Sequence, residues 1–599
     1  MTCNSLIIKC LLWVASLFVL FGCGKNDGQS VKKRRLNFAT VGVVKSLDPA
    51  LAADVTSRNM AGAIFDTLLQ YNYLARPYKL EPSILSEMPS ISEDNCHYTF
   101  KIRKDLYFHN DECFPSLADR RLTVDDIIFS FKRVIDPTMH SPVYWIFRGK
   151  IKGIDDFRSA VKKNSGNGVL QGYPIEIKGL KKIDDYTFSI ELSEPDPRFL
   201  YYLAMPAAAV VSKKATIYYN NDVNNHPIGS GAFKLKSWEK NYRLILERHP
   251  DYRSEFFTGA VTPADREKKL PLSDEVVYNI VKRPFAAWLL FMQGELDMAA
   301  LDKDNLDILN ENGEISPALV ERGIKLHQAP AFEIRYVGFN MQNRLFKDNS
   351  NLRKAISCAY DLSRRRRHAG GQLLPANGPV IIGVDGYDEN LENPYSYDLQ
   401  KAKEFLKKAG YENGIDPVTD KPLELNFDLN GSSSHYLQLG EMLASDLAKI
   451  GIHVNICLNS SPRFFEKVRR GETDLFFLSW VGDYPDAENF LQLFYSGRIG
   501  SANRVGYRDL KFDQMFEKIS SMQQSEERTE IYQDMAKYIV DECVWIYDGI
   551  PMNYQLTHSF LENFAPHNFN FGTLKYLSVD PEKRDAIKKS FKPMNLKEL

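Results

Sequence analysis

The sequence predicts an α/β protein that folds into two or three lobes, each with its own hydrophobic core. The chain has 599 residues, far more than one ordinary domain needs. Segments with the pattern of strands alternate with segments that resemble helices, which is typical of α/β lobes. After the N-terminal segment no apolar run reaches the roughly 18 residues of a membrane span, so we expect these lobes to be globular.

Five segments have the composition and pattern of strands. Apolar and polar residues alternate with a period of two from Tyr98 to Arg103 and again from Tyr186 to Leu192, as in strands that bury one face. The expected strands are 36–43, 98–103, 186–192, 423–429 and 452–458.

Three segments have the pattern of helices. Thr123 and Asp126 have the spacing of an N-terminal cap before an apolar run. The segment 398–409 places its apolar residues on one face and ends at Gly410, where a left-handed conformation carries no steric penalty. A third helix is expected near 436–449.

The N-terminus predicts export and a lipid anchor. Lys9 precedes about eleven apolar-leaning residues, the length of a signal-peptide core and not of a membrane span. Gly22 directly before Cys23 resembles a bacterial lipoprotein signal, in which cleavage leaves the cysteine as the lipid-bearing first residue. The alternative is a plain secretory signal with an incidental cysteine. The polar segment 24–35 is then a flexible tether.

Charge and cysteine content exclude several classes of function. The 76 Lys and Arg residues balance 77 Asp and Glu residues, which leaves no overall field to attract nucleic acid. Five cysteines follow the signal, an odd number, so at least one is free or pairs between chains. Cys96 and Cys113 flank an expected hairpin, and a disulfide between them is left open. The motifs CxxC, HExxH, GxSxG and the phosphate loop are absent, which counts against an enzyme.

Arg364–Arg367 is the sharpest local run of charge. It fits an anion site or a solvated helix end, and we favour the helix end.

Several short segments in collinear order form a recognisable set. They are 47–54 with 64–69, 98–111 with 122–133, Gly229-Ser-Gly-Ala-Phe-Lys-Leu235, Gly294-Glu-Leu-Asp297, 338–340 with 352–361, 402–410 and Trp480-Val-Gly-Asp-Tyr-Pro-Asp486. Together they resemble the extracytoplasmic oligopeptide- and dipeptide-binding proteins of ABC importers (solute-binding protein family 5). Asn110-Asp111 departs from the family pattern, which usually has His-Asp-Gly there.

The resemblance implies a two-lobe hinged periplasmic-binding-protein fold of type II, with an extra subdomain inserted in the first lobe. The chain would cross between the lobes near Glu333 and near Tyr547, a hinge that can close over a ligand. The expected parts are 1–22 signal peptide, 23–35 lipid anchor and tether, 36–66 and 191–332 lobe I, 67–190 inserted subdomain, 333–547 lobe II, and 548–599 the return to lobe I with the tail.

The resemblance also implies which residues bind a ligand. A free peptide carries an ammonium group, and a buried ammonium without an anionic partner is prohibitive. Asp483 matches the family's ammonium-binding aspartate, although a turn-capping role before Pro485 is the alternative. The other candidates are Trp480 in a side-chain pocket, Val481 and Val55 flanking the ligand, Asn430 and His435 at its far end, and Tyr547 at the second crossing. For Trp480 a place in the core, and for His435 simple solvation, are the alternatives.

Two departures put recognition of the ligand's carboxyl end in doubt. Phe477 and Val468 stand where the oligopeptide branch has arginines. Arg469 and Arg470 could substitute, although a surface turn is the favoured interpretation for them. Val481 replaces a cysteine that one branch uses in a disulfide.

The sequence therefore predicts a binding protein, not an enzyme, which captures peptides and delivers them to an ABC importer permease. It is expected to be monomeric, anchored to a membrane by lipid, and without cofactor, metal or nucleic acid. The same fold with a metal chelate, haem or an oligosaccharide as its solute is the alternative. An extracytoplasmic hydrolase is less favoured, because no catalytic motif is present and His97, His109, Asp111 and Cys113 fall in the inserted subdomain, away from the expected cleft. A chaperone that holds extended chains is a minor alternative.

Overall fold

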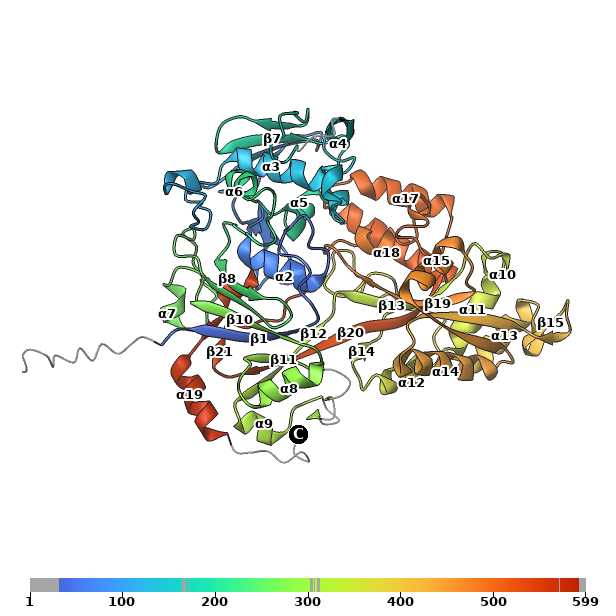
Figure 1. The fold of residues 1–599 in the computed structure, drawn as a ribbon. Coiled ribbons are helices and arrows are strands. Elements are labelled where there is room, and N and C mark those ends of the chain that lie inside the picture. The colour runs from blue at the N-terminus through green and yellow to red at the C-terminus, as the bar shows by residue number, and fades with distance from the viewer. Residues whose placement is uncertain are drawn as a thin grey trace, which may run out of the picture. The chain divides into compact units, whose positions relative to one another are not determined.

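The structure is a computed structural model that describes residues 32–163, 168–171, 173–301, 305, 308–309, 313–569 and 571–591. Arg34–Leu599 forms one compact unit, and every element named below belongs to it (Figure 1). The signal sequence and Cys23 lie outside the described residues, so the lipid anchor stays a prediction. Within the described part no helix is both long and apolar enough to cross a membrane.

The N-terminal region builds a four-stranded sheet in the order β1-β10-β9-β8, in which only β1 and β10 run parallel. The expected strand 36–43 is confirmed as β1 and ends early, because Gly42 adopts φ +109°. The strands are β1 (Arg35–Val41), β8 (Phe233–Glu239), β9 (Arg243–Arg248) and β10 (Glu275–Val281).

A second four-stranded sheet, in the order β4-β5-β7-β6, lies in the region predicted as an inserted subdomain. The expected strands 98–103 and 186–192 are confirmed as β5 and β7, which pair antiparallel. Thr123 caps α3 in a capping box with Asp126, as the spacing predicted. The elements are β4 (Ser90–Ile91), β5 (His97–Lys101), β6 (Leu180–Lys182), β7 (Thr187–Glu191), α3 (Val124–Ile135) and α4 (Ile154–Lys163).

An eight-stranded sheet follows the path β11-β20-β13-β19-β17-β18, with β12 and β14 also paired to β20. The long strand β20 is visible in red in Figure 1. The strands are β11 (Met298–Ala300), β12 (Ile324–Pro330), β13 (Glu333–Phe339), β14 (Leu373–Leu374), β17 (Glu424–Asn430), β18 (His453–Asn459), β19 (Leu475–Val481) and β20 (Trp545–His558).

The long strand β20 pairs with two successive strands, β12 and β13, along different parts of its length. β12 pairs with residues 552–558 of β20, whereas β13 pairs with residues 545–549. Ala331 and Phe332 join β12 to β13, so the chain changes at these two residues from pairing with one half of β20 to pairing with the other half. We call these two residues the Ala331–Phe332 switch. The predicted crossings at Glu333 and Tyr547 lie beside this switch, and the division into lobes stays a prediction.

The expected strands 423–429 and 452–458 are confirmed as β17 and β18, which pair in parallel. The two expected helices are confirmed as α13 (Leu399–Lys408) and α14 (Ser434–Ala448), with Asp398 capping α13 and Gly410 at φ +91°. The remaining two-stranded sheets are β2 (Leu69–Tyr71) with β3 (Leu80–Pro82), β15 (Ile415–Asp416) with β16 (Lys421–Pro422), and β21 (Leu561–Glu562) with β22 (Ser578–Val579).

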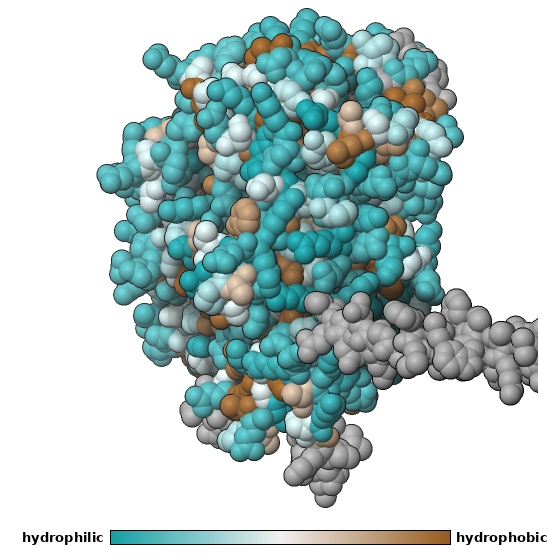
Figure 2. Space-filling model, turned by 90° about the vertical axis from the view of Figure 1, so that its left-hand side faces the viewer, coloured by the Kyte–Doolittle hydropathy of each residue, from teal (hydrophilic) through white to brown (hydrophobic). Residues whose placement is uncertain are grey.

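The other α-helices lie between or after these strands in the chain order. They are α2 (Val55–Ile64), α5 (Phe199–Tyr202), α6 (Lys213–Tyr218), α7 (Pro263–Arg266), α8 (Pro284–Met292), α9 (Pro317–Glu321), α10 (Arg344–Lys347), α11 (Ser350–Ala359), α12 (Leu362–His368), α15 (Ser461–Arg470), α16 (Glu488–Leu491), α17 (Leu510–Ser521), α18 (Glu526–Glu542) and α19 (Pro581–Ser590). On the face in Figure 2 hydrophilic residues predominate and hydrophobic ones form scattered groups.

Four of the sequence segments that carry the resemblance meet in the core, in two pairs. Arg133 donates two hydrogen bonds to the carboxylate of Asp48, at 2.7 and 2.5 Å, and both side chains are buried. A Cβ atom on Gly229 would stand 2.0 Å from the carbonyl oxygen of Ile64, so only glycine allows this approach of the two chain segments. These residues therefore maintain the fold.

Two of the four arginines in the basic run on α12 are paired with acids, so the run is not only a solvated helix end. Arg364 pairs with Asp446 at 2.8 Å, and buried Arg365 pairs with Asp548 at 3.0 Å. The run therefore packs α12 against its neighbours.

The possible disulfide between Cys96 and Cys113 is not formed, because both cysteines are free. His109 is buried and hydrogen bonds with the carbonyl oxygen of Gly231, and it packs edge-on against His249. Among the described residues no three His, Cys, Asp or Glu side chains come together in a way that could hold a metal ion.

Candidate functional site

Two cavities meet at Asp483. The Val481 cavity has a volume of about 450 Å³ and the Trp480 cavity about 600 Å³, and Asp483 and Trp145 line both. The Val481 cavity is lined by Ala53, Val55, Arg58, Asn59, Pro142, Val143, Trp145, Ile146, Met205–Ala207, Ala331–Glu333, Val481–Asp483, Asn553, Asn568, Phe569 and Phe571. The Trp480 cavity is lined by Trp145, Arg148–Lys150, Asp155, Arg198, Tyr202, Trp480, Asp483, Tyr484, Glu488, Asn489, Gln492, Arg498, Ser501 and Ala502.

The backbone fixes the place of Asp483. β19 pairs with β13 up to Val481, which stands opposite Glu333. The next residue, Gly482, donates its N–H to the carbonyl oxygen of Phe332 at 2.9 Å. A Cβ atom on Gly482 would come within 2.2 Å of the Phe332 ring, so glycine is required at this turn. Asp483 therefore leaves the sheet edge next to the Ala331–Phe332 switch between β12 and β13.

Asn489 positions both Trp480 and Asp483. Its side-chain oxygen accepts a hydrogen bond from the Trp480 indole N–H and another from the Asp483 backbone N–H, each at 3.0 Å. Asn489 is fully buried on α16. Asn489 is not among the residues predicted from the sequence, because nothing in its local pattern separates it from an ordinary helix residue.

The Asp483 carboxylate has no ion pair with a described residue. Burial raises the pKa of this carboxyl above its ordinary value, while the charge of Arg58 and the amide of Asn489 oppose the rise. A carboxylate with this pKa gains stability when a cation reaches it, because the cation offsets the cost of burial. The arrangement is suited to binding a positively charged group.

Val55 and Val481 are exposed hydrophobic residues on the wall of the Val481 cavity, at 58% and 56% exposure. Val55 begins α2, which Asp54 caps by accepting from the N–H of Ser57 at 2.9 Å. The structure thus brings Val55, Trp480, Val481 and Asp483 together around two adjoining cavities.

The other three candidates lie elsewhere among the described residues. Asn430, at the end of β17, accepts a hydrogen bond from Ser461 at 2.7 Å, and His435 on α14 packs edge-on against Tyr436. Tyr547 is buried on β20, opposite Tyr336. None of the three is among the residues that line the Val481 or Trp480 cavity, and their roles stay predictions.

The positions without the family's arginines contain no cation. Val468 is buried and Phe477 is partly buried. Arg469 and Arg470 both pair with Glu466 on the same exposed helix, at 2.7 and 2.6 Å, as expected for surface residues.

A charged contact joins segments on the two sides of the predicted hinge. Arg198 forms an ion pair with Glu488, and the Tyr484 hydroxyl donates to the other Glu488 oxygen at 2.6 Å. The rings of Tyr201 and Tyr484 stack at 5.7 Å beside this pair. The sequence analysis missed this contact, since its partners lie 290 residues apart.

The sequence profile of the bacterial extracellular solute-binding proteins, family 5, middle region, matches residues 79–502. The chain is 24% identical over 595 residues to heme-binding protein A of Haemophilus influenzae, which covers 95% of this chain and 98% of that protein. It is 26% identical over 533 residues to the oligopeptide-binding protein OppA of Bacillus subtilis, at 87% and 88% coverage.

Among solved structures, the chain is similar to the ABC transporter-associated periplasmic binding protein DppA from Helicobacter pylori in complex with peptide STSA. The TM-score is 0.67 at 24% identity, and the match covers 92% of this chain and 99% of that chain. This likeness confirms the predicted α/β, two-lobe periplasmic-binding fold.

Proposed function

The chain belongs to the bacterial extracellular solute-binding proteins of family 5, and we propose that it captures peptides between its lobes, with Asp483 pairing the peptide ammonium group. The family acts outside the cytoplasm. We further propose that the lobes are divided as the sequence predicts, that a lipid on Cys23 anchors the protein, and that a monomer delivers its peptide to an ABC importer permease without acting as an enzyme.

One observation carries the peptide proposal. Of the two acidic residues that line the Val481 cavity, Glu333 pairs with Arg335 at 3.0 Å, whereas Asp483 has no ion pair with any described residue. Its carboxylate borders a cavity flanked by the exposed backbone end of β19, which suits pairing with an extended peptide. A neutral sugar would leave that charge without a partner.

The test is titration calorimetry of the wild-type protein and Asp483→Asn with a pool of short peptides. We expect the variant to lose at least a hundredfold in affinity, because breaking a buried charge pair costs about 3–5 kcal/mol. The same peptides with an acetylated amino terminus should bind the wild-type protein weakly, and their affinity for the variant should be no lower than for the wild-type protein. Equal affinity of wild type and variant for free peptides would refute the role of Asp483.

Haem is the second candidate solute, because a relative named heme-binding protein A matches 95% of the chain. Mass spectrometry of ligand that copurifies with the native protein separates the two candidates. A peptide mass supports the first proposal, and haem or a metal chelate overturns it.

A further inference from the structure

Among the described residues the Val481 cavity is lined by a second charge that has no ion pair, that of Arg58. Arg58 lies in the first turn of α2, between Val55 and Asn59, and all three residues line the cavity. No described residue forms an ion pair with it, and its Nε atom is buried without a hydrogen-bond partner. The ring of Phe571 lies 5.9 Å from the guanidinium carbon and supports the side chain by a cation–π contact.

Arg58 and Asp483 therefore place two opposite charges on the wall of one cavity, and both charges are available to a ligand. The charged residues that line this cavity are Arg58, Glu333 and Asp483, and Glu333 is already paired with Arg335. Arg58 comes from α2 and Asp483 from the turn after β19, so the two charges approach the cavity from different parts of the fold. They form no ion pair with each other; burial raises the pKa of Asp483, and the charge of Arg58 opposes part of that rise.

We propose that Arg58 binds the terminal carboxylate of a short peptide whose ammonium group is held by Asp483. This inference rests on the proposed function and adds the carboxyl-end contact that Phe477 and Val468 cannot supply. A guanidinium presents a planar fork of donors that fits a carboxylate, and Arg58 lines the cavity where such a carboxylate would lie. A volume of about 450 Å³ is near the lower end for small-molecule pockets, which favours a short peptide.

The cations of the Trp480 cavity are less suited to this role. Arg198 and Lys150 are paired with Asp196 at 2.6 and 2.7 Å. Arg148 and Arg498 are exposed, and an ion pair in that environment contributes little. A carboxylate therefore gains most at Arg58.

The experiment compares each short peptide with its carboxyl-terminal amide, by calorimetry on the full-length protein. In the wild-type protein the free acid should bind about 10- to 100-fold more tightly than the amide, as a charged hydrogen bond predicts. Arg58→Gln should lose that preference, while its affinity for the amide changes by no more than about twofold. Arg58→Lys should retain part of the preference.

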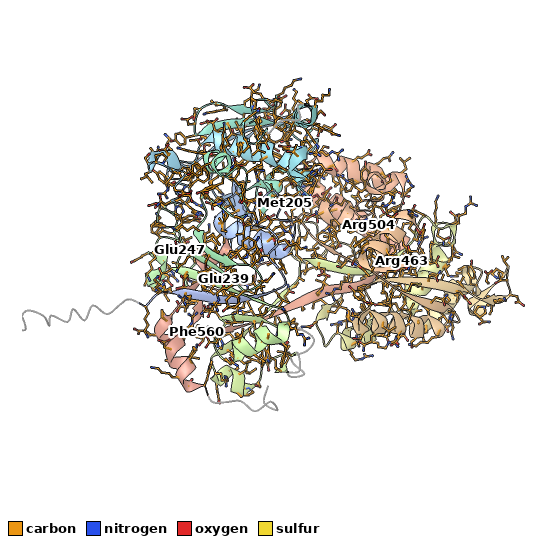
Figure 3. The ribbon with its side chains drawn as sticks, in the orientation of Figure 1. Met205, Glu239, Glu247, Arg463, Arg504 and Phe560 are labelled. Atoms are coloured by element: carbon orange, nitrogen blue, oxygen red, sulfur yellow. The ribbon has the colours of Figure 1, made fainter. Side chains whose placement is uncertain are left out.

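Arg463→Gln is the matched control. Arg463 is an exposed arginine on α15 that lines neither cavity. Figure 3 labels Arg463 together with Met205, which lines the Val481 cavity. This variant should keep the preference for the free acid in full. Thermal unfolding of each variant establishes that it is folded, and the acid–amide comparison in the wild-type protein needs no variant.

The outcomes separate this inference from the proposed function. If the wild-type protein binds acid and amide equally, or if Arg58→Gln weakens both equally, Arg58 is not the carboxylate site although peptide binding stands. If no peptide binds and haemin does, both proposals fall.

Discussion

Replacing Glu488 with glutamine should shift the protein toward an open arrangement of its lobes. The carboxylate of Glu488 is 1% exposed and pairs with Arg198, whose side chain is 11% exposed. The two residues lie on opposite sides of the predicted hinge. Because this pair forms only when the two segments meet, its energy favours the closed arrangement.

The free energy that Glu488→Gln removes depends on which contacts the side chains at positions 488 and 198 retain. In Glu488→Gln the amide oxygen can still accept from Tyr484, and Arg198 keeps its pair with Asp196 at 2.6 Å. The variant thus loses one charge-assisted contact, worth about 1.5–3 kcal/mol, and not the 3–5 kcal/mol of a stranded buried charge. That loss changes the closed-to-open ratio by about 10- to 100-fold.

The assay is small-angle X-ray scattering without ligand, together with peptide affinity by calorimetry. We expect a larger radius of gyration and a weaker affinity, because the binding-competent closed state becomes less populated. Glu466→Gln is the matched control, since it breaks only exposed pairs with Arg469 and Arg470 within one helix, which solvent screens and which contribute little. The reasoning fails if Glu488→Gln leaves both quantities at their wild-type values.

Two further variants test the stability of the unit. Asp48→Ala should lower the free energy of unfolding by about 3–5 kcal/mol, measured by chemical denaturation, because it strands buried Arg133; an effect below about 1 kcal/mol would contradict this. Burial lowers the pKa of His567 to about 3, so the unfolded chain binds more protons between about pH 6.5 and 3, and stability falls as the pH falls through that window. The pH dependence of unfolding should therefore be shallower in His567→Phe than in the wild-type protein, and equal slopes would contradict this.

Local signals were enough to predict the regular elements. The two-residue alternation at β5 and β7 and the Thr123 cap of α3 depend on neighbours in the sequence, and the structure confirms all three. Arg364–Arg367 shows the limit of that approach, because the acceptors of Arg364 and Arg365, Asp446 and Asp548, come from distant segments.

Some residues of the candidate site could be predicted from the sequence, and others could not. Asp483, Trp480, Val481 and Val55 were chosen by resemblance, and they line the two adjoining cavities. Arg58 was missed, although it stands three residues after Val55, because an arginine in a helix usually points into solvent or pairs with a nearby acid. Its significance comes from an acid 425 positions away in the chain.

The sequence by itself determined the order of strands, helices and family-like segments, because those features depend on residues close together along the chain. The three-dimensional packing alone decided that Asn489 holds Trp480 and Asp483 in place and that Arg58 lines the cavity of Asp483 without an ion pair to any described residue. Whether a charge is neutralised or left available depends on which remote groups the fold brings near it, and composition and spacing carry no record of that.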